Sequence, residues 1–314
     1  MSRQVAHESE EGRFLGNTGS LHEIILPEFA VLGRLYKRTS RSAYTSLFGT
    51  RGLAPQSRCS VIVAHPDDEV IGAGALISKL NDVSIVHLTD GAPLNSRVSE
   101  EAGFDHPADY AEARRRECLS ALAVANVQAD RIVELAGIDY YAPHFLSDLA
   151  KRITTFLQQT APDIVITQPY EGGHPDHDSA AFATHAAVRL LERNGFAPPT
   201  VFEMALHPSK DGRARVLDFL PSAGRETTTL ILDQEACDLK RRMFECFATQ
   251  REALKLNPLG PEKFRRPPAY DFMMPPHLGK FNYEDFHSGI TRDEWLALAR
   301  QAWSGLFHED AQAH

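Results

Sequence analysis

From residue 60 onward, short apolar runs rich in β-branched residues alternate with amphipathic stretches, and this alternation constrains the fold most strongly. The candidate strands are residues 60–64, 83–88, 132–135, 163–167, 200–206 and 228–232. The candidate helices are residues 69–80, 108–125, 144–159, 178–193, 234–254 and 291–306. Nearly all-apolar strands that alternate with helices indicate a mostly parallel sheet covered on both faces. We therefore predict an α/β fold with right-handed crossovers.

Two helices carry more detailed signals. Phe145, Leu149, Ile153 and Phe156 have the spacing of a helix with one buried face. The last helix has a capping box at its start, because Glu294 follows Thr291 by three residues.

Composition and charge exclude several classes of protein. The chain has 314 residues, 43% hydrophobic and 24% charged, which is ordinary for a globular protein. Its formal net charge of −9 gives no general reason to expect a nucleic-acid partner. The four cysteines form no CxxC pair. No apolar run is long enough to span a membrane. Residues 1–14 lack the apolar core of a signal peptide, so we predict a cytoplasmic protein.

We predict that the chain divides into three parts. These are an N-terminal arm or extension at residues 1–57, the main domain at residues 58–255, and a Pro-rich loop with a C-terminal helix packed on that domain at residues 256–314. Segment 257–283 is so rich in Pro that we expect no regular helix or strand there. Long loops of this kind serve as lids, binding loops or subunit contacts, so the segment is compatible with a homo-oligomer.

Two polar clusters follow two of the predicted strands. His65, Asp67 and Asp68 come directly after residues 60–64, where a Pro marks the turn into a helix. The second cluster, residues 168–178, follows residues 163–167 and includes His174, Asp176 and His177. Because the carboxyl ends of parallel strands lie at one edge of a sheet, the two clusters can meet there.

These residue types suit metal-dependent hydrolysis. Neutral imidazoles and a carboxylate are typical Zn²⁺ ligands, and three protein ligands leave a position for water. A bound zinc ion lowers the pKa of that water to about 7. A carboxylate outside the ligand set can take the proton, and a nearby His can stabilise the developing oxyanion. Either cluster alone could equally be a polar turn that caps a helix, but two of them at strand-to-helix junctions favour a site.

The sequence resembles the LmbE-like, or PIG-L-like, zinc-dependent de-N-acetylases over roughly residues 58–255. The resemblance rests on the string Ala64-His65-Pro66-Asp67-Asp68-Glu69 and on His174-Pro175-Asp176-His177. Weaker similarities are Thr89-Asp90-Gly91, Arg114 with Glu117, and the helix from Lys240 to Thr249-Gln250. The family fold is a Rossmann-like α/β sandwich, in agreement with the predicted sheet.

The resemblance implies a role for each motif residue. His65, Asp68 and His177 would bind one zinc ion per chain, with Fe²⁺ as the alternative metal. Asp67 would be the general base, His174 would stabilise the oxyanion, and Asp176 would support a neighbouring His.

Two further residues are candidate substrate contacts. Arg97 is a candidate because some relatives place an Arg after the second-strand motif. Some relatives also carry a Tyr two residues before the first His of the second motif. Here Gly172 holds that position, and Tyr170 lies two residues further back.

We therefore expect a metal-dependent hydrolase that removes an N-acetyl or related N-acyl group from an amino sugar or a similar small amide. Two alternatives remain. A phosphoesterase would hold two metal ions and need more carboxylate ligands. A binding module would have kept the fold without turnover, and it has no chemical need for Asp67.

Overall fold

The computed structural model describes residues 57–208, 217–220, 226–255, 257, 259–285 and 289–308. The predicted arm lies outside these residues except for Ser57. The strands are β1 Arg58–Val63, β2 Asp82–Pro93, β3 Ile132–Asp139, β4 Ile164–Thr167, β5 Thr200–Met204, β6 His207–Pro208, β7 Leu217–Asp218, β8 Thr227–Leu230 and β9 Glu262–Arg265. The helices are α2 Asp68–Ile77, α3 Ser96–Glu101, α4 Pro107–Val124, α5 Leu146–Thr160, α6 Pro175–Arg193, α7 Gln234–Glu245, α8 Arg251–Leu254 and α9 Arg292–Phe307. Short 3₁₀ turns occupy Ala129–Arg131, Ala142–Phe145 and Asn282–Glu284.

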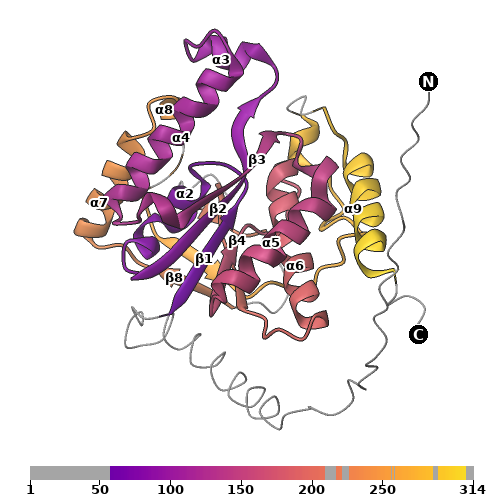
Figure 1. Cartoon of the computed structure of the whole chain (residues 1–314). Helices are drawn as coiled ribbons and strands as arrows, with labels where there is room; N and C mark the ends of the chain where they lie inside the picture. The colour runs from indigo at the N-terminus through magenta and orange to yellow at the C-terminus, as the bar shows by residue number, and fades with distance from the viewer. Residues whose placement is uncertain are drawn as a thin grey trace, which may run out of the picture.

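A seven-stranded sheet with the order β3-β2-β1-β4-β5-β9-β8 forms the centre of the molecule. The first five strands in this order run parallel, and β9 is antiparallel to both β5 and β8. Helices α2, α4 and α7 cover one face, and α5 and α6 cover the other, with α9 outside them (Figure 1). The predicted α/β fold with a mostly parallel sheet is therefore confirmed.

The strand β1 shows why this sheet is stable. Val61 and Val63 face the layer of α2 and α4, whereas Ile62 and Ala64 face the layer of α5 and α6. All four side chains are fully buried. A strand that is covered on both sides needs apolar residues at every position, and this explains its unbroken apolar run.

The Pro-rich segment contains a strand, so the prediction that it has no regular structure was wrong. Strand β9 lies between Pro261 and Pro267, and its four residues keep the N–H groups that pairing requires. Phe264 of β9 is fully buried in the main core. Glu262 accepts hydrogen bonds from the backbone of Ala75 and Leu76 and pairs with the buried Lys240.

Two predicted helices differ in detail from the observed ones. The predicted helix 234–254 is interrupted between α7 and α8, where the backbone N–H and hydroxyl of Thr249 donate to Glu117 at 3.0 and 2.6 Å. Phe145 precedes α5 and is exposed, whereas Leu149, Ile153 and Phe156 form the predicted buried face. The capping box of Thr291 and Glu294 is confirmed.

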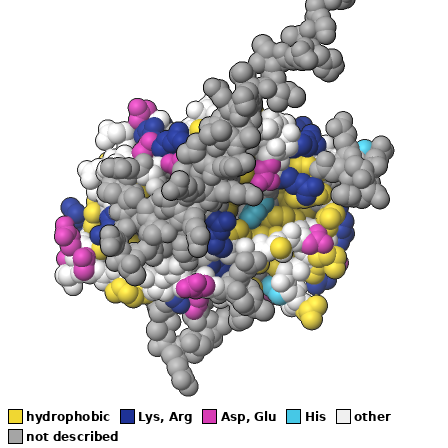
Figure 2. Space-filling view, turned by 90° about the horizontal axis from the view of Figure 1, so that it is seen from below, with side chains coloured by type: hydrophobic (Ala, Val, Ile, Leu, Met, Phe, Trp, Pro, Cys, Tyr) yellow, Lys and Arg dark blue, Asp and Glu magenta, His cyan; other side chains and the backbone are white. Residues whose placement is uncertain are grey.

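The surface mixes charge types. On the face shown in Figure 2, basic, acidic and apolar side chains of the described residues lie among one another. No helix in the described part of the chain is long and apolar enough to cross a membrane.

Candidate active site

The two predicted clusters meet at the carboxyl edge of the sheet because β1 and β4 are neighbours. His65 and its carboxylate neighbours follow β1, and His174 and His177 lie at the start of α6, which follows β4. One ring nitrogen from each of His65, His174 and His177 lies within 4.8 Å of the others. The prediction that the two clusters meet is therefore confirmed.

Asp68 lies between two imidazoles. One of its carboxylate oxygens is 3.3 Å from His65 Nδ1, and the other is 3.4 Å from His177 Nε2. Burial raises the pKa of Asp68, but the two His side chains outweigh this effect and hold it well below its usual value. Two imidazoles and an ionised carboxylate within this reach form a donor set that suits a divalent metal ion such as zinc.

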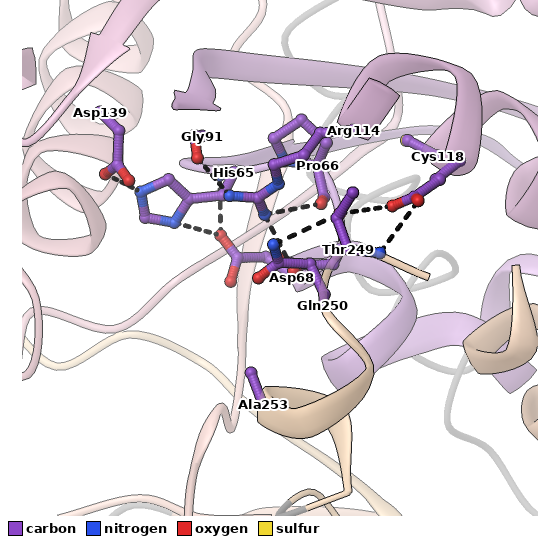
Figure 3. A network of polar contacts seen from close by, with 12 residues as sticks. His65, Pro66, Asp68, Gly91, Arg114, Cys118, Asp139, Thr249, Gln250 and Ala253 are labelled. Atoms are coloured by element: carbon purple, nitrogen blue, oxygen red, sulfur yellow. Dashed lines mark hydrogen bonds and ion pairs between the residues drawn. The ribbon is translucent and has the colours of Figure 1, made fainter. Parts of the chain in front are cut away.

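His65 is held on its other side by two carboxylates. Its Nε2 lies 2.9 Å from Asp139 Oδ1 and 3.3 Å from Asp176 Oδ2 (Figure 3 shows His65 between Asp139 and Asp68). Burial opposes protonation of His65, yet Asp139, Asp176 and Asp68 together raise its pKa well above its usual value. A metal ion at this cluster would therefore compete with a proton for His65.

Asp67 is nearly buried and has an unusual backbone. Its φ of 145° lies in a region that non-glycine residues rarely adopt. Arg114 Nη2 lies 2.9 Å from its Oδ2. Burial raises the pKa of Asp67 to about 7, although Arg114 opposes the rise. A carboxyl group with a pKa near neutrality is suited to accept and release a proton at working pH.

His174 is placed to donate a hydrogen bond. Its Nδ1 accepts the backbone N–H of Asp176 at 3.2 Å, so neutral His174 carries its proton on Nε2. Burial and the neighbouring His65 and His177 keep its pKa well below the usual value. The ring of Tyr140 lies against it, with ring centroids 4.6 Å apart.

Asp176 is fully buried and orients both backbone and side chain at the site. Besides His65, it accepts hydrogen bonds from the backbone N–H groups of Tyr140 at 2.6 Å and Ala142 at 3.2 Å. Burial raises its pKa to about 6. It therefore connects the start of α6 with the loop that follows β3.

Three residues of the site were missed or misassigned by sequence reasoning. Asp139 ends β3, but the predicted strand stopped at residue 135, before the irregular backbone at Ala136 with its φ of 50°. Gln168 donates to Asp68 at 3.0 Å and accepts from the backbone of Ala64 at 2.9 Å. Arg114 was noted in the sequence as a weak similarity together with Glu117, but it is buried and paired with Asp67.

The segment Thr89-Asp90-Gly91 contacts both Arg114 and the residue that follows β1. The hydroxyl of Thr89 donates to the Ala64 carbonyl at 3.1 Å, which links β2 to the residue that follows β1. Gly91 has a φ of 69°, and its carbonyl accepts a hydrogen bond from Arg114. A Cβ atom at this position would collide with the guanidinium of Arg114.

The two candidate substrate contacts, Arg97 and Tyr170, stay predictions, and the structure gives the surroundings of each. Arg97 lies on α3 with an exposed side chain that pairs with Glu101 at 2.7 Å. Tyr170 is 1% exposed, stacks on Trp295, and donates its hydroxyl to the Met274 carbonyl at 3.0 Å. Its ring belongs to the aromatic core beneath α9.

Gly172 explains why this chain lacks a Tyr at that position. Its φ is 67°, and a Cβ atom there would lie 2.7 Å from the ring of Phe281. The N–H of Asn282 also donates to the Gly172 carbonyl at 2.8 Å. The C-terminal segment therefore packs directly against the second motif.

Residues 60–188 match the family model described as PIG-L: GlcNAc-PI de-N-acetylase. The chain is 26% identical over 178 residues to a 1D-myo-inositol 2-acetamido-2-deoxy-alpha-D-glucopyranoside deacetylase of Salinispora arenicola (strain CNS-205), a match that covers 49% of this chain and 58% of that protein. It is 23% identical to the probable N-acetyl-alpha-D-glucosaminyl L-malate deacetylase 2 of Bacillus subtilis (strain 168), with 62% and 83% coverage. The diacetylchitobiose deacetylase of Thermococcus kodakarensis (strain ATCC BAA-918 / JCM 12380 / KOD1) is 33% identical, with 40% and 47% coverage.

Solved structures share the fold. A deacetylase from the biosynthesis pathway of teicoplanin superposes with a TM-score of 0.53 at 20% identity, covering 67% of this chain and 97% of that one. The A40926 pseudoaglycone deacetylase superposes with a TM-score of 0.52 at 22% identity, covering 68% and 100%. The family motifs and the matched relatives agree that residues 60–188 of this chain are similar to the PIG-L family of de-N-acetylases.

Proposed function

We propose that this protein is a metal-dependent hydrolase that removes an N-acetyl group from a small amino-sugar-like substrate. The observation that carries the proposal is the position of Asp67. Asp67 directly precedes Asp68 in the sequence, and its carboxyl group has a pKa of about 7. The two carboxylate oxygens of Asp68 face His65 and His177. A base beside a metal-capable cluster is the arrangement that amide hydrolysis by water requires.

The proposed ligands are His65, Asp68 and His177, and zinc is the proposed metal. When bound, the metal would supply a water molecule that is acidic enough to act at neutral pH. Asp67 would accept the proton of that water, and Arg114 would fix the direction of its carboxyl group. His174 would donate from Nε2 to the carbonyl oxygen as negative charge develops on it. Asp139 and Asp176 would orient His65.

The two rival functions have weaker support. The matched relatives are named deacetylases, which favours neither a phosphoesterase nor a silent binding module. A second group of potential donors does exist, formed by His65, Asp139, His174 and Asp176. Two backbone N–H groups already occupy the oxygens of Asp176, which leaves this group less suited to a second metal.

The test is acetate release from N-acetylglucosamine, its simple glycosides and diacetylchitobiose, together with metal stoichiometry. We expect release that stops with a chelator, returns with zinc, and requires one metal ion per chain. Two metal ions per chain together with hydrolysis of phosphate esters would favour the phosphoesterase. Absence of both metal and acetate release would overturn the proposal and favour the binding module.

A further inference from the structure

A buried polar cluster lies beside the site and is not part of the proposed metal centre. It consists of Glu69, His87 and Cys118, which come from α2, β2 and α4. Glu69 is 0% exposed, His87 1% and Cys118 2%. Buried polar groups at such depth are costly unless they are paired, so this cluster requires an explanation.

The backbone of Asp67 gives that explanation. A φ of 145° at a non-glycine residue persists only where the surroundings enforce it. The Asp67 N–H donates to Glu69 Oε2 at 3.2 Å, and this bond fixes the peptide that enters the unusual conformation. The carbonyl of Asp67 is also engaged, because it accepts the N–H groups of Val70 and Ile71 at 3.0 and 2.9 Å.

Glu69 is held in turn by two other elements. His87 Nε2 lies 3.1 Å from Glu69 Oε2, and Cys118 Sγ lies 3.4 Å from Glu69 Oε1. Burial and then Glu69 raise the pKa of the Cys118 thiol well above its usual value, so the thiol is a donor. Both carboxylate oxygens therefore have a partner on a different element, which leaves Glu69 little freedom to turn.

We infer that Glu69 is a positioning residue, fixed by His87 and Cys118, that holds the backbone of Asp67 in the conformation in which its carboxyl group can serve as the base. This inference rests on the proposed function. Its geometric part, that Glu69 fixes the Asp67 peptide, can be measured without any turnover.

The test compares Glu69→Ala, which removes the acceptor, with Glu69→Gln, which keeps an oxygen for the N–H of Asp67 and for His87. We expect Glu69→Ala to lower kcat at least about tenfold with KM changed less than about twofold, since misplacement of a catalytic group acts on the chemical step. Glu69→Gln should recover most of kcat. Metal stoichiometry should stay at the wild-type value in both variants.

Glu262→Ala is the matched control. Glu262 is also 0% exposed and contacts the same helix at Ala75 and Leu76, but it does not contact Asp67. If loss of any buried carboxylate that contacts α2 lowered kcat, Glu262→Ala would lower it as much as Glu69→Ala. We expect its kcat, per folded molecule, to stay near that of the wild type.

Hydrogen exchange of a peptide spanning residues 65–70 gives the readout that does not depend on activity. Glu69→Ala should speed exchange there, and Glu69→Gln should not. If Glu69→Ala does not fold, Glu69→Asp replaces it, because the shorter side chain withdraws the oxygen while keeping the charge. A wild-type kcat with unchanged exchange in the variant that folds would overturn the inference. A wild type without any deacetylase activity would instead count against the proposed function.

Discussion

Arg114 Nη2 lies 2.9 Å from Asp67 Oδ2 and 3.1 Å from the carbonyl oxygen of Pro66. One buried guanidinium therefore holds both the carboxyl group of the proposed base and the peptide that precedes it. Arg114 comes from α4, whose next turn carries Cys118 against Glu69. One helix thus acts on Asp67 twice, once directly and once through Glu69.

Arg114→Ala should reduce both stability and turnover. Removing one partner of a buried ion pair typically costs about 3–5 kcal/mol, because the other charge stays buried without compensation. The neighbouring Arg115 is the control: it is exposed and pairs with Glu134 at 3.0 Å on the surface. Arg115→Ala should change the free energy of unfolding by less than about 1 kcal/mol. Urea denaturation of both variants measures the difference, and equal losses would contradict the buried role of Arg114.

Asp67→Asn should abolish most turnover without loss of metal. The amide has nearly the shape of the carboxyl group but cannot accept the proton, and general-base catalysis contributes about 10²–10⁴-fold. We expect kcat to fall at least about 10²-fold. Acetate release, measured on protein whose metal content has been quantified, checks this. Near-normal turnover with metal bound would remove Asp67 from its proposed role.

Asp139→Asn should weaken metal binding although Asp139 is not among the proposed ligands. Asp139 lies 2.9 Å from His65 Nε2, and loss of such an orienting partner typically lowers metal affinity about 10–100-fold. Glu134→Gln, on the same strand but exposed, is the control. Competition with a chromophoric chelator gives both affinities. An unchanged affinity in Asp139→Asn would show that His65 needs no support from β3.

His185 should make the protein sensitive to mild acid. Burial lowers the pKa of His185 to about 4, whereas an unfolded His titrates near about 6.5. The unfolded state therefore binds more protons between these values. The stabilising effect of neutral, buried His185 is therefore complete above about pH 6.5. As the pH falls toward 4, this effect is lost progressively, and the free energy of unfolding decreases by at most about 1.4 kcal/mol per pH unit.

His185→Phe should flatten this dependence. The ring of His185 packs edge-on against Tyr270 and beside Phe272, so an apolar ring fits these surroundings. Denaturation at pH 7 and at pH 5 should show a smaller difference for the variant than for the wild type. Equal differences would mean that other groups cause the acid sensitivity.

Sequence alone was sufficient where local pattern decides structure. The unbroken apolar run of β1, the Pro after it and the two acids beyond it predicted both a buried strand and a site at its end. The same reasoning placed His174 and His177 at the end of β4, and parallel pairing of β1 and β4 brought the two clusters together. Strand pairing at one edge follows from the fold class, so the meeting of the clusters could be predicted.

Only the tertiary structure decided which other residues reach the site. Asp139 lies beyond an irregular turn at Ala136, and no periodic pattern continues through such a backbone. Arg114 stands among three consecutive arginines, and only the packing of α4 against β2 buries that one beside Asp67. Tyr170 resembled a substrate contact in sequence but lies in the aromatic core under α9. Local sequence determines strands, turns and caps through short-range forces, whereas the burial and partners of a side chain depend on elements that are distant along the chain.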